Sequence, residues 1–198
     1  SSKDLPSIDS IQFEYARKLC RQNDKKVELS SPVRDTVISG SVVKIRKGFK
    51  GSLQVFASDS VIVEEGVVME YPSGIYVDSG ERRPYVSLER GSKVNGYIIV
   101  SSQNSDSQLR HPSYVHKSGA TLNGLLYVDG SCNIEGDIIG AAYVKDCYYY
   151  SNGNVYPGTL YDARVVRRDS LAFPIFLEGT KKKKMIRKLH RVWKGRRL

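Results

Sequence analysis

The fold class is decided by residues 122–138, which read Leu122-Asn123-Gly124-Leu125-Leu126-Tyr127-Val128-Asp129-Gly130-Ser131-Cys132-Asn133-Ile134-Glu135-Gly136-Asp137-Ile138. A five-residue pattern, in which an apolar residue stands two positions before and two positions after a glycine, opens and closes this stretch. The same pattern recurs earlier in the chain, so the pattern glycines are Gly40, Gly51, Gly96, Gly124 and Gly136. A repeat of this kind indicates stacked units that bury their apolar faces only against their neighbours.

Around these glycines, short runs rich in Val, Ile, Tyr and Leu alternate with Gly, Ser, Asn and Asp. β-branched and aromatic residues favour strands, and the polar clusters favour turns. We therefore predict an all-β domain over residues 27–166, built as a single-stranded parallel β-helix. The pattern glycines are expected at its corners, because glycine adopts positive φ without steric cost. Segments 71–86 and 101–116 are expected to leave the coil as insertions.

An antiparallel sandwich or barrel is the alternative architecture, because Asn-Gly and Asp-Gly pairs are typical of hairpin turns. Such pairs occur at residues 95–96, 123–124, 129–130 and 152–153. The β-helix is favoured because glycine recurs in one five-residue frame rather than between irregular partners.

The longest regular stretch, residues 115–143, resembles the bactofilins, a family of polymer-forming bacterial cytoskeletal proteins. Residues 61–68 and 86–96 carry the same resemblance, in runs such as Val61-Ile62-Val63-Glu64-Glu65-Gly66-Val67-Val68. The resemblance implies a right-handed parallel β-helix, polymerisation through the ends of the coil and no bound nucleotide. Unlike the family's compact and regular core, this chain has interrupted repeats and tyrosine-rich segments near its C-terminus.

Two extensions flank the predicted domain. In residues 1–26, Ser7 or Ser10 is a suitable N-cap for a short helix over residues 12–20. Because the first residue is Ser1, a signal peptide or membrane anchor could have preceded it. Residues 167–198 form an apolar segment followed by a basic tail, which is expected to be helical.

The basic tail carries the charge of the chain. Residues 181–198 contain ten Lys and Arg and no acid, which equals the formal net charge of +10. Apolar residues at helical spacing predict one apolar stripe among these charges. The residues expected to contact a membrane or partner are Lys181, Lys182, Lys183, Lys184, Ile186, Arg187, Leu189, Arg191 and Trp193.

Three interpretations of this tail are compatible with the sequence. It could lie on an anionic membrane surface, bind nucleic acid without specificity, or pack on the domain. The membrane is favoured over nucleic acid because the rest of the chain is close to neutral.

A tyrosine-rich region before the tail is a candidate binding face for glycan or protein. Its residues are Tyr143, Tyr148, Tyr149, Tyr150, Tyr156 and Tyr161. The sequence favours the other interpretation, in which these rings pack against and cover the end of the coil.

The sequence contains no recognisable enzymatic or metal-binding motif, so we predict no catalytic residue, metal or cofactor. His111 and His116 are expected to be surface loop residues. Cys132 and Cys147 could form a disulfide, although three cysteines in the chain do not make a complete framework. A left-handed β-helix acyltransferase is the enzymatic alternative, but no regular six-residue repeat is present.

Taken together, these features favour a non-enzymatic scaffold of the bacterial cell envelope, associated with the membrane and able to self-associate. A surface binding module for glycan or protein is the alternative. Nucleic acid and small-molecule substrates are not expected.

Overall fold

The computed structural model describes residues 25–101 and 111–167, and these residues are all-β, without a helix. Their strands are β1 (Val27–Leu29), β2 (Thr36–Ile45), β3 (Lys50–Gly51), β4 (Leu53–Val63), β5 (Val68–Asp78), β6 (Tyr85–Leu88), β7 (Lys93–Ser101), β8 (Tyr114–His116), β9 (Thr121–Ile134), β10 (Asp137–Ser151), β11 (Asn154–Pro157) and β12 (Arg164–Val166). The helix predicted over residues 12–20 and the basic tail lie outside the described residues.

The strands pair in parallel, and the one antiparallel pairing among the described residues joins β10 to β11. Parallel strands need a crossover between them, whereas antiparallel neighbours can be joined by a tight turn. An antiparallel sandwich is therefore excluded for these residues. Of the four turn-like pairs, Asn152-Gly153 makes the β10–β11 hairpin, and the other three lie within β7 and β9.

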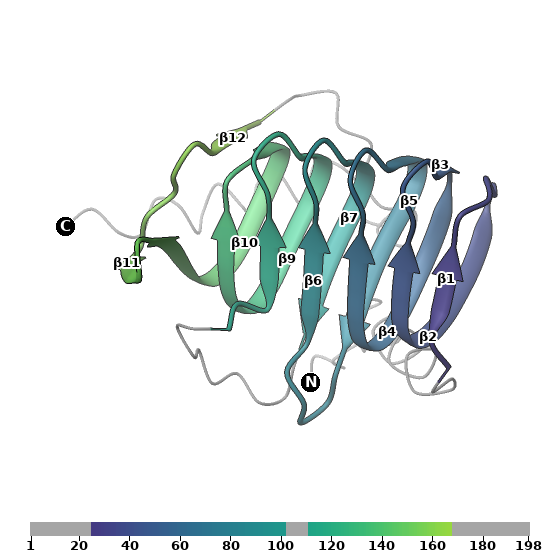
Figure 1. Cartoon of the computed structure of the whole chain (residues 1–198), viewed down its shortest axis with the longest axis horizontal. Helices are drawn as coiled ribbons and strands as arrows, with labels where there is room; N and C mark the ends of the chain where they lie inside the picture. Colours follow the sequence, from purple (N-terminus) through teal and green to yellow (C-terminus); the bar gives the residue numbers. More distant parts are fainter. Residues whose placement is uncertain (1–24, 102–110, 168–198) are drawn as a thin grey trace, which may run out of the picture.

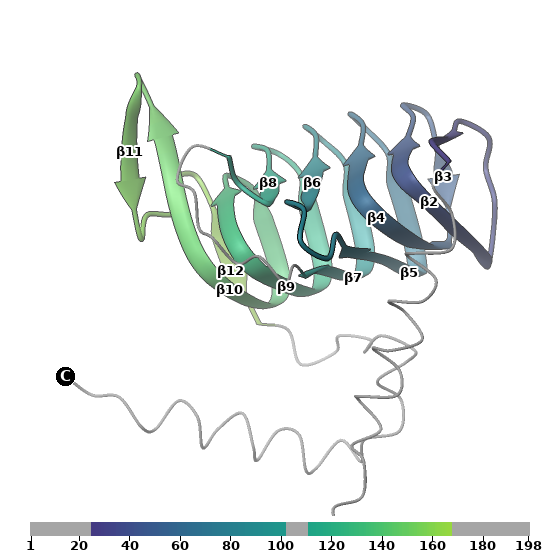
Figure 2. The ribbon, with the colours of Figure 1, turned by 90° about the horizontal axis from the view of Figure 1, so that it is seen from below.

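The chain builds the sheet in layers, each of which lies in register on the one before. Gly96 of β7 pairs with Gly124 of β9, and Gly124 pairs with Gly140 of β10. Figure 1 shows the strands in two groups, one in front and one behind, with the chain crossing between them at the top. Figure 2 shows that β9 and β10 bend, so that one strand runs along more than one side of the stack.

The core lies between these sides and is filled by alternate residues of each strand. In β9, Leu122, Leu126 and Val128 are buried, whereas Tyr127 between them is exposed. Register partners make one continuous row along the stack, consisting of Ile38, Val55, Ile75, Ile98, Leu126 and Ala142. Fully burying one such Leu or Ile side chain contributes roughly 1.5–3 kcal/mol.

Four corners between strands use a glycine of positive φ that is not a pattern glycine. Gly48, Gly66, Gly91 and Gly119 have φ values of 89°, 70°, 70° and 76°. Each is the third residue after the end of a strand, β2, β4, β6 or β8 in turn, and lets the chain turn.

Four of the pattern glycines lie within strands rather than at the expected corners, and of these only Gly96 and Gly124 pair with each other; Gly136 does lie at a corner. Gly96 and Gly124 lie inside strands, where a Cβ would be 1.8 Å from the Ser73 oxygen and 1.6 Å from the Gly96 oxygen, respectively. Close stacking of backbones therefore requires glycine there. Gly40 instead pairs with Ala57, Gly51 pairs with Met69, and Gly136 lies between β9 and β10.

The expected insertions were drawn too wide. Residues 71–78 belong to β5, and residues 79–84 leave the stack between β5 and β6. Pro72, which cannot donate to a ladder, lies where the β5–β7 register shifts between Met69 and Ser73. Of the second expected insertion, residues 102–110 lie outside the described residues, and residues 114–116 form β8, which pairs with β6.

Candidate functional site

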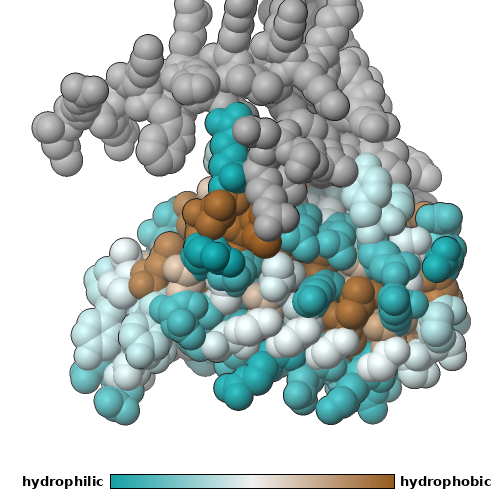
Figure 3. Space-filling view, turned by 90° about the horizontal axis from the view of Figure 1, so that it is seen from above, coloured by the Kyte–Doolittle hydropathy of each residue, from teal (hydrophilic) through white to brown (hydrophobic). Residues whose placement is uncertain are grey.

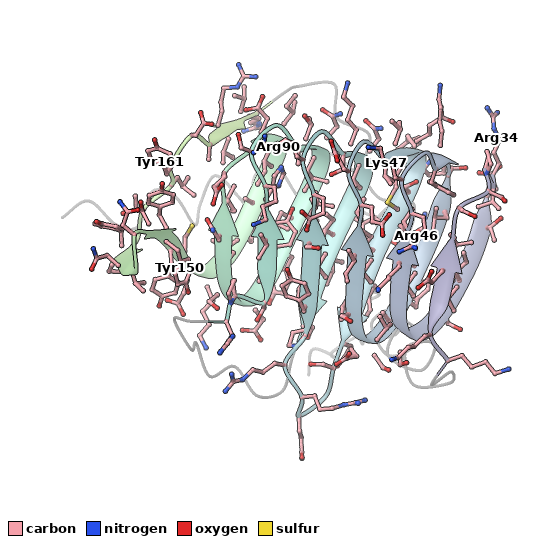
Figure 4. The ribbon with its side chains drawn as sticks, in the orientation of Figure 1. Arg34, Arg46, Lys47, Arg90, Tyr150 and Tyr161 are labelled. Carbon is pink, nitrogen blue, oxygen red and sulfur yellow. The ribbon has the colours of Figure 1, made fainter. Side chains whose placement is uncertain are left out.

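Three tyrosines gather at the C-terminal end of the stack, of which Tyr149 is half-buried and the other two are exposed. The turn of the β10–β11 hairpin has positive φ at Asn152 and Gly153, at 51° and 77°, and its register places Tyr149 opposite Tyr156. The ring of Tyr149 stacks on that of Tyr161 with a centroid distance of 4.4 Å, and its centroid lies 6.1 Å from that of Tyr156. Tyr156 and Tyr161 are 45% and 56% exposed. These three rings, the tyrosine cluster, offer an aromatic surface to solvent at the end of the stack where Figure 4 labels Tyr161.

The other predicted tyrosines lie elsewhere. Tyr148 is buried, so it does not belong to an exposed face. Tyr150 precedes the hairpin turn and alternates with Tyr149 along β10, and burial raises the pKa of its hydroxyl. Tyr143 pairs instead with Tyr127 on β9, and both are exposed. The predicted six-tyrosine face is thus divided among separate places.

Tyr127 is a surface residue that the sequence reasoning missed. A signal for it was present, because Gly124–Val128 and Gly140–Val144 share the spacing Gly-x-x-Tyr-Val. Aligning the two runs would have placed Tyr127 beside Tyr143.

The two ends of the stack expose corresponding strand segments. Among the described residues, 36–38 of β2 pair only with β4, and 140–142 of β10 pair only with β9. Ile38 and Ala142 stand at the two ends of the same core row. An unpaired strand edge offers its N–H and C=O groups to another strand.

Charged side chains follow the corners between the two groups of strands. Arg46 donates to Glu64 at 2.8 Å, and Lys47 Nζ lies 3.6 Å from Glu65. A hydrogen bond from the Lys47 backbone N–H is the main reason that the pKa of Glu64 is lowered. An open depression here is lined by Lys47, Glu64, Glu65, Glu89 and Arg90.

Figure 3 looks onto this edge, where hydrophilic side chains predominate between hydrophobic patches. Figure 4 places Lys47 and Arg90 along the same upper edge. Solvent-exposed ion pairs contribute little to stability, so we interpret this row as a solvated, internally neutralised surface.

A polar group lies inside the apolar core near the C-terminal end. The Tyr114 hydroxyl is 2.9 Å from Nδ1 of His116, and both side chains are fully buried. Burial lowers the pKa of His116 and raises that of Tyr114. The prediction that His116 is a surface residue is therefore wrong, because β8 aims it into the stack; His111 is exposed.

Gly136 makes room for this histidine. A Cβ on Gly136 would lie 2.6 Å from Cδ2 of His116. The two described cysteines, Cys132 and Cys147, are register partners nearby, and both are free thiols.

Within residues 25–101 and 111–167, no group of three or more His, Cys, Asp and Glu side chains could hold a metal ion. No helix in that part of the chain is long and apolar enough to cross a membrane. The tail residues Lys181 to Trp193, which were predicted to contact a membrane, lie outside it.

Comparison with protein-family models gave no match, and neither did comparisons with curated proteins and solved structures.

Proposed function

We propose that this chain is a non-enzymatic scaffold protein of the bacterial cell envelope, bactofilin-like in architecture, that self-associates end to end. In this proposal its stack is a single-stranded parallel β-helix with a right-handed sense. The basic tail holds the scaffold against an anionic membrane surface.

The layered register supports the β-helix. One side of every layer continues in register on the next, as in the series Val43, Val61, Val86, Tyr114 and Cys132. In Figure 1 the front strands run upward while the chain advances from right to left, which favours a right-handed coil.

The observation that carries self-association is the correspondence between the two open edges. If residues 140–142 of one copy pair in parallel with residues 36–38 of the next, the core row continues from Ala142 to Ile38 across the junction. The same register places Ala141 of one copy beside Val37 of the next. Such a head-to-tail contact leaves a new open edge at each end, so it generates a filament rather than a closed dimer.

Val37 and Ala141 provide the test of this contact. Val37 is 60% exposed, and both residues lie on the outward row of their strands. We expect the wild-type chain to form concentration-dependent oligomers in analytical ultracentrifugation, and linear assemblies in negative-stain microscopy. The double variant Val37→Lys/Ala141→Lys should remain monomeric, because like charges directly opposite each other across strands are destabilising.

The matched control is Val37→Lys/Ala141→Glu, which places opposite charges at the same junction. Assembly should return in this variant. A wild-type chain that is monomeric at every concentration would rule out the scaffold proposal, as would equal assembly of the Lys/Lys and Lys/Glu variants.

The tyrosine cluster favours a second candidate, a module that binds glycans. Exposed tyrosine rings provide apolar faces beside polar hydroxyl groups, which suits the faces of sugar rings. Affinity electrophoresis in polysaccharide gels should then show retardation that Tyr149→Ala removes and Tyr127→Ala retains. Unretarded migration in all gels would count against this candidate.

A further inference from the structure

Cys132 of β9 and Cys147 of β10 occupy the same position in adjacent layers. They are direct register partners in a parallel pairing. Neighbouring strands lie about 4.8 Å apart, which is within the range of roughly 4.4–6.8 Å that disulfides span between Cα atoms. The backbone spacing therefore permits a bond between the two sulfurs.

Both side chains belong to the interior of the stack. Cys132 is fully buried, and Cys147 is partly buried against the same core cluster. Their row continues from Val86 and Tyr114 on earlier layers. The two thiols thus face the same enclosed space rather than opposite sides of the sheet.

The strand geometry changes immediately before Cys147. The β9–β10 register shifts between Val144 and Asp146, where the strand carries a bulge or irregularity. Bulges bend a strand and re-aim its side chains. This local freedom matters because a disulfide needs the Cβ atoms closer together than a regular parallel ladder holds them.

The two thiols differ in pKa and in exposure, as suits an attacking and a resolving cysteine in thiol–disulfide exchange. The Cys132 thiol shares a hydrogen bond with Cys147, and this contact is the main reason that the pKa of Cys147 is lowered and that of Cys132 raised. Cys147 is also the more exposed of the two. A thiolate is the attacking species, and the second thiol resolves the mixed disulfide.

We propose that Cys132 and Cys147 are a reversible disulfide site that joins β9 covalently to β10. In the first step, Cys147 thiolate attacks one sulfur of a disulfide-bonded oxidant and releases the other sulfur as a thiolate. Cys132 then loses its proton, attacks the Cys147 sulfur and releases the second half of the oxidant. Two protein thiols are oxidised to one disulfide, and one oxidant disulfide is reduced to two thiols.

The bond would anchor the strand that carries the exposed end of the stack. β10 continues from Cys147 into the hairpin with β11 and the tyrosine cluster. Cross-linking residues fifteen positions apart restricts the unfolded chain and ties this end to β9. The inference rests on the β9–β10 pairing alone and is independent of any self-association.

The full chain, reduced and then incubated with glutathione disulfide, provides the test. Intact-mass measurement should show the loss of two hydrogen atoms, and peptide mapping should link Cys132 to Cys147. The melting temperature should rise by about 5–10 °C and return to its first value with a reducing agent.

Two serine variants separate this site from the third cysteine. Cys20→Ser should retain both the mass change and the thermal shift, whereas Cys147→Ser should lose both. The proposal is overturned if both thiols remain open to alkylation under denaturing conditions after oxidation. It is equally overturned if the mapped bond contains Cys20, or if glutathione stays attached to Cys147 without resolution by Cys132.

Discussion

Backbone contact between layers is most restrictive at Gly124. The backbone of β7 passes so close to it that a Cβ would lie 1.6 Å from the Gly96 oxygen, and its φ is 150°. At Gly91 the φ of 70° is also unfavourable for other residues, but nothing lies within 4 Å of a Cβ there. Comparing the two positions distinguishes the steric effect of a neighbouring layer, present only at Gly124, from the strain of an unfavourable backbone conformation, which Gly91 has alone.

Gly124→Ala should therefore destabilise the chain by more than about 3 kcal/mol, because either the layers must separate or the strand must distort. The matched variant Gly91→Ala should cost only about 1–2 kcal/mol. Urea denaturation followed by far-UV circular dichroism measures both. Equal losses in the two variants would contradict the close stacking at Gly124.

His116 stands in a core row whose other members are aliphatic: Leu29, Ile45, Val63, Leu88 and Ile134. Its Nε2 has no hydrogen-bond partner among the described residues, and burial lowers its pKa below the ordinary value of 6.5. The unfolded chain consequently binds a proton near pH 6.5 that the folded chain binds only at lower pH. The contribution of His116 to the free energy of unfolding is therefore fully present above pH 6.5 and is lost as the pH falls below that value.

We expect the free energy of unfolding to decrease below pH 6.5, with a contribution from His116 of at most about 1.4 kcal/mol per pH unit. His116→Leu should show a shallower decrease between pH 6.5 and 5, although its stability at pH 7 is lower because Tyr114 loses its partner. Urea denaturation at a series of pH values measures the two slopes. Identical slopes would show that His116 is protonated in the folded chain as readily as in the unfolded one.

At the scale of elements, some connections between strands are held against the neighbouring layer, whereas others lie outside the strand pairing. Residues 79–84 lie between β5 and β6, outside the pairing, and Glu81, Arg82 and Arg83 are exposed. The corner at Glu64 and Glu65 instead joins β4 directly to β5, and Glu64 N–H donates to the Ile45 oxygen of the preceding layer.

Inserting Gly-Ser-Gly-Ser between Glu81 and Arg82 should shift the melting temperature by no more than a few degrees, because lengthening a surface loop has a small entropic cost. The same insertion between Glu64 and Glu65 should abolish the cooperative transition, because it disrupts a corner held against the previous layer. Thermal melts followed by circular dichroism measure both. A cooperative melt of the second variant near the wild-type temperature would contradict the layered register.

Strand positions could be predicted because short β-branched runs between glycines allow few other structures. In β9, the alternation of Leu122, Leu126 and Val128 with polar or exposed residues marks the inward side directly. The register could not be predicted, since consecutive layers are 28 and then 16 residues apart at Gly96, Gly124 and Gly140.

Candidate site residues were harder to place for the same reason. Without the register, Tyr143 could not be separated from the hairpin tyrosines, and Tyr127 could not be placed beside it. His116 was misassigned because polarity suggested a loop, whereas its position in β8 follows from pairing with β6 and β9.

On the scale of the whole molecule, charge is divided unevenly along the chain. The ten basic residues of 181–198 account for the formal net charge of +10, so residues 1–180 are close to neutral. Acidic and basic side chains pair along the corners of the described part, as at Arg46 and Glu64. Electrostatic attraction to an anionic surface is therefore expected from the tail rather than from the stack.

The full chain should co-sediment with vesicles that contain anionic phospholipid and only weakly with neutral vesicles. Truncation after Thr180 should abolish this binding, and 0.5 M salt should weaken it, because the Debye length falls to about 4–5 Å at that ionic strength.

Trp193→Ala keeps every charge but removes an interfacial anchor, so it should reduce vesicle binding while leaving retention on a sulfated polyanion such as heparin unchanged. If the truncated chain binds anionic vesicles as well as the full chain does, the stack itself must carry the attraction. If Trp193→Ala binds vesicles normally, the tail recognises negative charge alone and the apolar stripe does not enter the membrane surface.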